Sequence, residues 1–167
     1  LRPAVADAKP ELSPLRLWIH GSSAGDVLCQ LPLVDKLSQL TTLELVVSAF
    51  TGSGVEMARQ RFAQAQVVYQ PLDLPGATRR AMQDLRPELL ILERAEIWPA
   101  LIHAAHQVGA KVAIVNGRIS PSSVRPYQRL FQLSGPVLDE VDLFLMRDDD
   151  EASRIKAIGA APERVFV

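Results

Sequence analysis

The strongest constraint on the fold is a regular alternation of short apolar runs with longer amphipathic stretches. Stretches of roughly 10 to 14 residues with helical apolar spacing separate successive runs. An alternation of this kind predicts right-handed βαβ units, and therefore a parallel sheet covered by helices on both faces. The runs expected to be strands are residues 15–20, 43–48, 67–69, 89–93, 111–115, 141–146 and 164–167.

Residues 15–167 are expected to form one Rossmann-like domain of the α/β class. A chain of 167 residues is long enough for a single core that buries roughly two thirds of its unfolded surface. Residues 1–14 contain three prolines and no periodicity, so they predict a lead-in segment. The last predicted strand reaches Val167, from which we expect the natural protein to continue.

Charge and cysteine content narrow the classes of partner. A formal net charge of −1 provides no global field that would draw the protein to nucleic acid. The single cysteine cannot form an internal disulfide or a thiolate metal cluster, which favours a reduced, cytoplasmic setting. No run approaches the ~18 apolar residues of a membrane span.

Polar, turn-forming clusters follow four of the predicted strands. They are residues 21–26, 51–54, 93–96 and 116–120. Because the carboxyl ends of parallel strands share one rim of the sheet, the clusters are expected to converge on one crevice, where open α/β sheets bind ligands. Arg94, Arg118 and Arg125 carry forked donors suited to phosphate or carboxylate groups.

Asp26 is the candidate catalytic base, since it follows the turn after the first strand. The remaining candidates are expected to lie at the substrate site, with a packing role left open for two of them: His20 as a packed histidine that donates to the backbone, and Trp98 as an apolar plug at the helix start. These candidates are His20, Ser23, Gly25, Thr51, Ser53, Gly54, Arg94, Glu96, Trp98, Asn116, Arg118, Ser120 and Ser123.

Other interpretations of the same residues stay open. Residues 21–25 match G-x-S-x-G, the nucleophile turn of serine hydrolases, but His103 and His106 fall within a predicted helix rather than on a later loop. The turn lacks the spacing of a dinucleotide fingerprint. It could also be a plain helix start, with Asp26 as a favourable first-turn charge.

Taken together, the motifs resemble the N-terminal domain of the 3-deoxy-D-manno-octulosonic acid (Kdo) transferases of lipopolysaccharide assembly. The resemblance covers residues 15–167. The matching segments, in family order, are WIHGSSAGD at 18–26, TGSG at 51–54, PLDLP at 71–75, EIWP at 96–99 and NGRISPSS at 116–123 with Tyr127.

This resemblance implies one half of a two-domain glycosyltransferase B fold. The N-terminal half would take the lipid A precursor, while a C-terminal half, absent from this chain, would bind CMP-Kdo as donor. The family's proposed base corresponds to Asp26. Transfer would invert the anomeric centre, without a cofactor or metal, at the cytoplasmic face of the bacterial inner membrane, and this chain alone would be inactive.

Two residues depart from the family pattern. Asp26 stands where the family has Glu, which shortens the reach of the carboxylate by about 1.5 Å, and a misplacement of that size can lower a rate about 100-fold. Arg94 stands where the family has the first Glu of E-T-E, which reverses a charge in the crevice. The alternative function is therefore a catalytically impaired module that binds a glycolipid or a nucleotide sugar.

Overall fold

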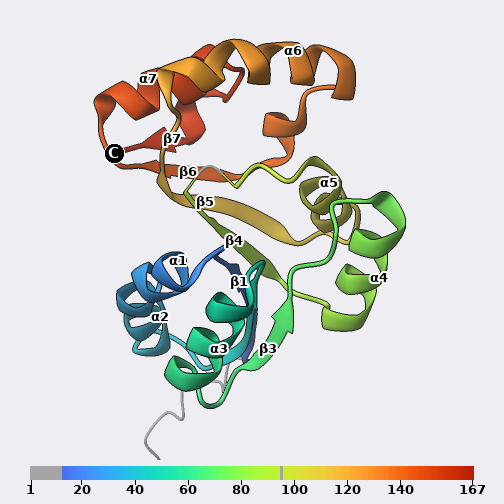
Figure 1. The fold of residues 1–167 in the computed structure, drawn as a ribbon, viewed down its shortest axis with the longest axis vertical. Coiled ribbons are helices and arrows are strands. Elements are labelled where there is room, and N and C mark those ends of the chain that lie inside the picture. The colour runs from blue at the N-terminus through green and yellow to red at the C-terminus, as the bar shows by residue number, and fades with distance from the viewer. Residues whose placement is uncertain (1–12, 95) are drawn as a thin grey trace, which may run out of the picture.

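The computed structural model describes residues 13–94 and 96–167, without the side chains of 132–134 (Figure 1). The lead-in segment expected at 1–14 therefore lies almost entirely outside the described residues. Between residues 13 and 167 the structure contains no helix long and apolar enough to cross a membrane.

Seven parallel strands form one sheet in the order β3-β2-β1-β4-β5-β6-β7, which confirms the predicted α/β, Rossmann-like fold. The strand order reverses between β1 and β4, where the chain switches from one end of the sheet to the other. The strands are β1 Leu15–His20, β2 Leu43–Ala49, β3 Gln66–Tyr69, β4 Leu89–Glu93, β5 Lys111–Gly117, β6 Leu143–Met146 and β7 Val165–Phe166.

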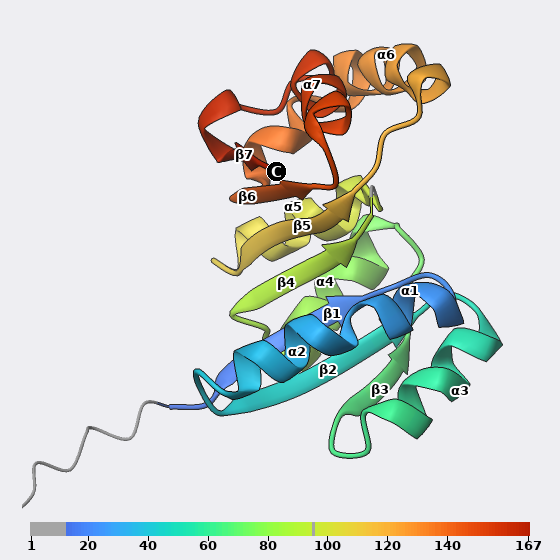
Figure 2. The same cartoon turned by 90° about the vertical axis from the view of Figure 1, so that its left-hand side faces the viewer.

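Helices cover both faces of the sheet (Figures 1 and 2). One layer contains α1 Ala24–Cys29, α2 Leu31–Ser38 and α3 Gly52–Arg61. The other contains α4 Pro75–Leu85, α5 Pro99–Gln107, η1 Pro121–Ser123, α6 Val124–Ser134, η2 Val137–Glu140, α7 Asp149–Ala157 and η3 Pro162–Arg164.

Alternation along β1 divides the apolar side chains between two cores. Leu17 and Ile19 pack with Val27, Val34 and other residues of the α1–α3 layer. Trp18, between them in sequence, lies in the core beneath α4 and α5. Because all three side chains are fully buried, β1 is an interior strand covered on both faces.

The apolar spacing of residues 27–40 predicts a single helix, but the structure has two helices in this stretch. The first begins three residues earlier, at Ala24, and the two share Gln30 as a cap residue. Pro32 explains the break, since it has no N–H to donate to a preceding turn. The Gln30 side chain also donates to the carbonyl oxygen of His20 at 2.6 Å, which attaches the break to the end of β1.

The turn predicted at Thr51–Gly54 is wrong in part, because Gly52 already begins α3. Thr51 is the N-cap, and its hydroxyl oxygen accepts the Gly54 N–H at 3.1 Å. A Cβ added at Gly54 would lie 2.7 Å from the Cβ of Ala49 and 3.3 Å from the carbonyl carbon of Ser23. The missing side chain thus lets the starts of α1 and α3 approach one another closely.

Candidate functional site

The crevice lies where the strand order reverses. The chain leaves β1 toward the α1 layer and leaves β4 toward the α5 layer, so the connections after these adjacent strands diverge. Asp26 and Arg94 face each other across this point, with the Nε atom of Arg94 2.8 Å from the Oδ1 atom of Asp26. Two residues 68 positions apart are thereby joined at the predicted catalytic position.

Asp26 is held in place by the first turn of its own helix. Its Oδ2 atom accepts the hydroxyl of Ser23 at 2.6 Å and the backbone N–H of Ser23 at 3.0 Å, completing a capping box. Gly21 makes this geometry possible, because a Cβ there would lie 3.0 Å from the backbone and Cβ of Asp26. The side chain of Asp26 is only 7% exposed, and its contacts with Ser23 fix its orientation.

Two residues at neighbouring strand ends adopt a left-handed backbone. Arg94 has φ of 60° and Asn116 has φ of 50°, both uncommon for residues other than glycine. The backbone N–H of Arg94 donates to the carbonyl oxygen of Val115 at 2.8 Å. The hydrogen bonding between β4 and β5 therefore continues to Arg94. This backbone turns Arg94 toward β1 and Asp26.

Glu93 is a buried acid directly below this turn. It is 1% exposed, and its Oε1 atom accepts the Nδ2 amide of Asn116 at 2.7 Å. Burial raises the pKa of the Glu93 carboxyl, and the nearby charge of Asp26 raises it further, against the lowering effects of Asn116, Arg94 and Arg118. Arg94 and Arg118 therefore lie within electrostatic reach of the same carboxyl.

Glu96 is the second acidic group on the β4–α5 connection. Burial is the largest cause of its raised pKa, and the charge of Asp26 adds to the effect, while the neighbouring side chains of Ser22 and Trp98 and the charge of Arg94 counteract it. Burial likewise raises the pKa of the Tyr127 hydroxyl, with the charge of Glu96 adding to the effect. Tyr127 on α6 thus lies within electrostatic reach of Glu96 on the β4–α5 connection.

His20 is completely buried beneath the crevice rather than exposed to it. Its Nδ1 atom lies 3.0 Å from the hydroxyl oxygen of Ser48, which also accepts the indole N–H of Trp18 at 2.8 Å and donates to Gln70 at 3.0 Å. Its ring lies edge-on to Trp98, with 6.1 Å between centroids. Burial lowers the pKa of His20 to about 4, so the ring is neutral at pH 7.

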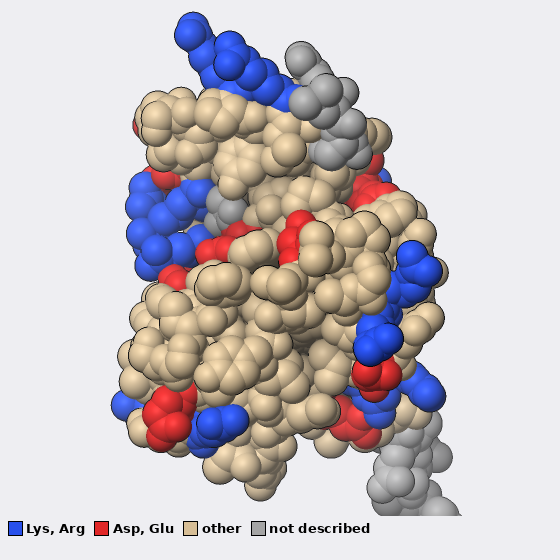
Figure 3. Space-filling view, turned by 45° about the vertical axis from the view of Figure 1, so that its right-hand side comes forward, with Lys and Arg blue, Asp and Glu red and all other residues tan. Residues whose placement is uncertain are grey.

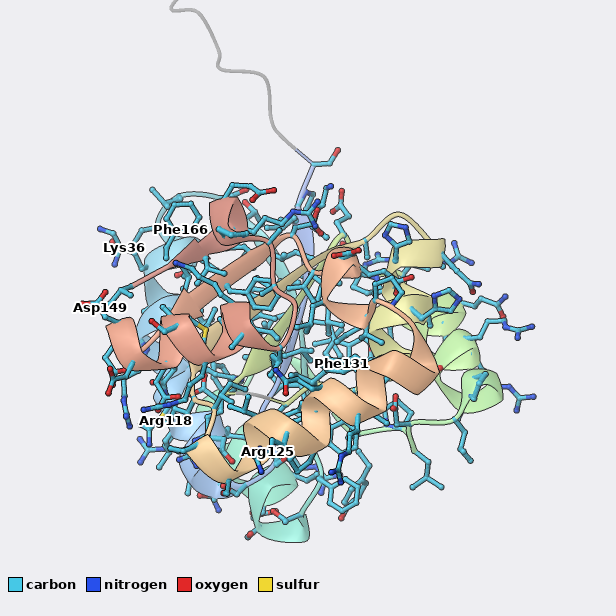
Figure 4. All side chains as sticks on the ribbon, turned by 90° about the horizontal axis from the view of Figure 1, so that it is seen from above. Lys36, Arg118, Arg125, Phe131, Asp149 and Phe166 are labelled. Carbon is cyan, nitrogen blue, oxygen red and sulfur yellow. The ribbon has the colours of Figure 1, made fainter. Side chains whose placement is uncertain are left out.

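Arg118 lies on a loop that is anchored on α7. The backbone N–H of Ile119 donates to Glu151 Oε2 at 2.5 Å, and its carbonyl oxygen accepts Arg154 Nη1 at 3.3 Å. The Arg118 side chain is exposed, as is that of Arg125 at the start of α6 (Figure 4). Arg118 directly follows β5, and its charge reaches the buried carboxyl of Glu93, whereas Arg125 lies on the first turn of α6.

The β2–α3 turn forms another wall. The backbone N–H groups of Phe50 and Thr51 both donate to the carbonyl oxygen of Ser22 at 3.1 Å. The hydroxyl of Thr51 contacts the same oxygen at 3.2 Å and lies 3.2 Å from the Ser53 hydroxyl. Thr51 therefore connects the β2–α3 turn to the β1–α1 turn that precedes Asp26, and Ser53 contacts Thr51.

Apolar side chains form a rim beside these polar groups. Phe50 is 52% exposed and stacks on Trp98 at 6.2 Å between ring centroids. Asp73 accepts the N–H groups of Ala100 and Leu101, which holds the exposed Leu72 and Leu74 next to the start of α5. In Figure 3, blue Lys or Arg side chains and red acidic side chains surround a broad tan surface, which is made of uncharged residues.

The structure brings most of the predicted site residues together, with several in supporting positions. Ser23 and Arg94 contact Asp26, and Glu96 lies within electrostatic reach of it. Trp98 packs against His20 and Phe50, and Asn116 donates to Glu93. Gly25 is exposed on the first turn of α1. Ser120 bonds the hydroxyls of Ser122 and Ser123, and no contact in the described structure links this serine group to Asp26.

Several contributors were not among the predicted site residues. Glu93 belongs to the polar cluster predicted at 93–96, where it is the acidic residue that closes an otherwise apolar strand. Phe50, Ser48, Gln70 and Glu151 carry no signal in the sequence, because each acts through a contact with a segment far away in the chain.

The geometry does not favour a serine hydrolase. The Ser23 hydroxyl binds Asp26, and His20 binds Ser48 instead. His103 contacts Glu140 at 2.9 Å and Gln107 at 3.0 Å on α5. Across residues 13–94 and 96–167, three or more His, Cys, Asp or Glu side chains do not gather anywhere in a way that could hold a metal ion.

Solved structures share the fold at low sequence identity. UDP-GlcNAc 2-epimerase from Neisseria meningitidis, bound to UDP-GlcNAc, matches 92% of this chain and 46% of its own with a TM-score of 0.63 and 10% identity. HepE of Anabaena, in complex with UDP and glucose, matches 92% and 43% with a TM-score of 0.66 and 12% identity. These likenesses confirm the α/β, Rossmann-like fold.

Sequence relatives identify the family. A 3-deoxy-D-manno-octulosonic acid transferase of Chlamydia pneumoniae is 30% identical over 95% of this chain and 37% of its own length. The Haemophilus influenzae transferase is 29% identical over 92% and 36%. A bifunctional glycosyltransferase/methyltransferase of Fusobacterium nucleatum is 31% identical over 89% and 24%.

The chain thus spans about a third or less of the length of these relatives. The family model for 3-deoxy-D-manno-octulosonic acid transferase (kdotransferase) matches residues 2–167, nearly the whole chain. By this match, the chain belongs to the Kdo transferase family.

Proposed function

We propose that this chain is the acceptor-binding half of a glycosyltransferase that transfers Kdo from CMP-Kdo to a lipid A precursor, with Asp26 as general base. The observation that carries the proposal is the position of Asp26, oriented by Ser23 at the point where the strand order reverses. Family membership supplies the reaction class.

In the proposed reaction, a hydroxyl of the acceptor attacks the anomeric carbon of Kdo. The bond from that carbon to the CMP phosphate breaks, CMP leaves with the electron pair, and Asp26 takes the hydroxyl proton. Attack opposite to the leaving group inverts the anomeric centre. A positioned base contributes roughly 10²- to 10⁴-fold to reactions of this kind.

The other walls of the crevice supply binding groups for an amphiphilic acceptor. Arg118 and Arg125 offer forked, exposed donors suited to phosphate. Glu96 and the Thr51–Ser53 turn offer acceptors and donors for sugar hydroxyls. Phe50, Leu72 and Leu74 form an apolar rim that suits acyl chains at a membrane surface, here proposed to be the cytoplasmic face of the inner membrane.

A transfer assay tests the proposed function. The native gene product that contains this chain is incubated with CMP-Kdo and lipid A precursor, and we expect product formation that falls about 100-fold or more in Asp26→Asn. Asp35→Asn, an exposed carboxylate on α2, is the matched control and is expected to keep full activity. Absence of transfer by the native protein would contradict the proposed reaction, whereas an active Asp26→Asn variant would remove only the base.

The alternative is a module that binds a glycolipid or nucleotide sugar without turnover. The ion pair between Asp26 and Arg94 favours it, because the guanidinium group already occupies one oxygen of the carboxylate that would take the hydroxyl proton. Saturable binding of lipid A precursor by the native gene product, with no transfer from CMP-Kdo, would support this alternative. Lack of binding would contradict it.

A further inference from the structure

The two oxygens of Asp26 are held in different ways. Two hydrogen bonds from Ser23 hold Oδ2, at 2.6 and 3.0 Å. Oδ1 has Arg94 Nε 2.8 Å away, but the contact is not aligned as a hydrogen bond, and this buried oxygen has no hydrogen-bond partner among the described residues. Oδ1 is therefore held by charge alone and is the oxygen that can be released.

Arg94 has further donors to offer. Its side chain is 45% exposed, and only Nε takes part in an ion pair. Its two terminal amino groups make no hydrogen bond or ion pair in the part of the chain that the structure describes. Because a guanidinium forms its strongest contacts through two parallel N–H groups, Arg94 is only partly used in the free protein.

A second cation, Arg118, lies on the same side of the crevice. Arg118 and Arg94 both act on the buried carboxyl of Glu93, from the ends of adjacent strands β5 and β4. Arg118 is exposed and pairs with no acidic group in the described structure. Two guanidinium groups on one side of the crevice can bind one doubly charged anion.

We propose that Arg94 exchanges partners, pairing with Asp26 in the free protein and with a phosphate group of the acceptor in the complex. Phosphate binding by Arg94 and Arg118 then withdraws Arg94 from Oδ1 and frees that oxygen to receive the hydroxyl proton. Arg94 is thereby a positioning residue that links acceptor binding to the availability of the base. The inference rests on the proposed function of Asp26.

Competition for Arg94 gives the exchange a measurable signature. In the 167-residue chain, titrated with inorganic phosphate, Arg94→Ala is expected to weaken binding about tenfold. Asp26→Asn is expected to tighten it roughly three- to tenfold, because the competing anion is gone. Glu96→Gln is the matched control, since it removes an equal charge from the same crevice without breaking a contact to Arg94.

A double variant separates exchange from general electrostatics. If Asp26 acts through Arg94, Asp26→Asn should change phosphate affinity no more than Glu96→Gln does once Arg94 is Ala. Tightening that persists in the Arg94→Ala background, or equal tightening by Asp26→Asn and Glu96→Gln in the native background, would overturn the inference. Lack of phosphate binding by the native chain would overturn it as well.

The ¹⁵Nε resonance of Arg94 provides a direct observation. We expect added phosphate to move this resonance in the native chain toward its position in Asp26→Asn, and an unmoved resonance at saturation would contradict the exchange. Titration with CMP under the same conditions tests the source of the phosphate. An equal response to CMP, with the same dependence on Asp26, would overturn the assignment to the acceptor.

These measurements require no sugar transfer, so their outcome is separable from the proposed function. A native gene product that transfers Kdo while phosphate leaves Arg94 in place would refute the exchange alone. If the chain shows the exchange but the native gene product transfers no Kdo, the proposed reaction is refuted. The release of Asp26 on phosphate binding then still stands.

Discussion

The Nδ1 atom of His20 lies 3.0 Å from the hydroxyl oxygen of Ser48 on the neighbouring strand. This contact determines which atoms of a buried hydrogen-bond network carry the protons. The Ser48 hydroxyl has one proton, which it donates to Gln70, and it accepts the indole N–H of Trp18. His20 must then donate from Nδ1, which leaves Nε2 without a proton and without a hydrogen-bond partner.

Nuclear magnetic resonance of the imidazole nitrogens tests this arrangement. At pH 7 we expect His20 to be a neutral ring with its proton on Nδ1, and His106, exposed on α5, serves as the reference ring. A proton found on Nε2 would show that Ser48 donates to His20 and that the Gln70 amide is turned the other way.

Acid should destabilise the fold through His20. Its pKa is about 4 in the folded protein and 6.5 ordinarily, so the unfolded chain binds more protons between these values. The contribution of His20 is fully present above pH 6.5 and is lost as the pH falls toward 4. Between pH 7 and pH 4.5, the free energy of unfolding should fall about 2 kcal/mol more in the native chain than in His20→Asn.

Denaturant unfolding at both pH values provides this comparison. His106→Asn is the matched control and should follow the native chain, because His106 is exposed. Equal pH dependence in the native chain and in His20→Asn would contradict burial of a neutral His20.

Glu93→Gln should stabilise the protein at neutral pH. Burial raises the pKa of Glu93, so its contribution to stability is present at low pH and is lost as the pH rises through the folded pKa. Glutamine keeps the oxygen that accepts from Asn116 and removes the buried charge. The free energy of unfolding should therefore rise at pH 7, with a smaller gain below pH 4.5.

Thermal and denaturant unfolding of Glu93→Gln across this pH range measures the effect. Glu163→Gln, on the exposed η3 turn, is the control and should leave stability unchanged at either pH. Destabilisation of Glu93→Gln at pH 7 would show that the carboxylate is stabilised by its neighbours Arg94 and Arg118.

Two glycines in first helical turns should respond oppositely to alanine. At Gly54 a Cβ would meet the Ala49 Cβ at 2.7 Å, so Gly54→Ala should lower the free energy of unfolding by about 1–3 kcal/mol. At Gly76 a Cβ would meet nothing within 4 Å, so Gly76→Ala should raise it by about 0.5–1 kcal/mol. Denaturant unfolding compares them, and equal effects would contradict the close packing of the start of α3 against Ala49 at the end of β2.

Strands were the most predictable part of the fold. The bounds predicted for β1 and β4 match the structure, because a buried parallel strand is a continuous apolar run and its polar flanks mark the ends. Helix starts were less predictable. Thr51 and Ser23 act as caps inside stretches that also had the composition of turns, since Gly and Ser serve both purposes.

Within the site, sequence pattern predicted the rim but not its pairings. Strand ends brought Asp26, Arg94 and Glu96 to one crevice, as expected from topology alone. The ion pair between Asp26 and Arg94 depends on a left-handed backbone at Arg94. The backbone preferences of arginine do not predict this conformation. The burial of His20 depends equally on partners from other strands.

The anchoring of Ile119 on α7 has a consequence for how this site can evolve. Both polar backbone groups of Ile119 are bound by Glu151 and Arg154, so the path of the loop depends on α7 and not on the exposed side chains at 118 and 120. Substitutions at these two positions can alter the chemistry presented to a ligand at little expense in folding. Related proteins can therefore differ in ligand preference through this loop without losing stability of the fold.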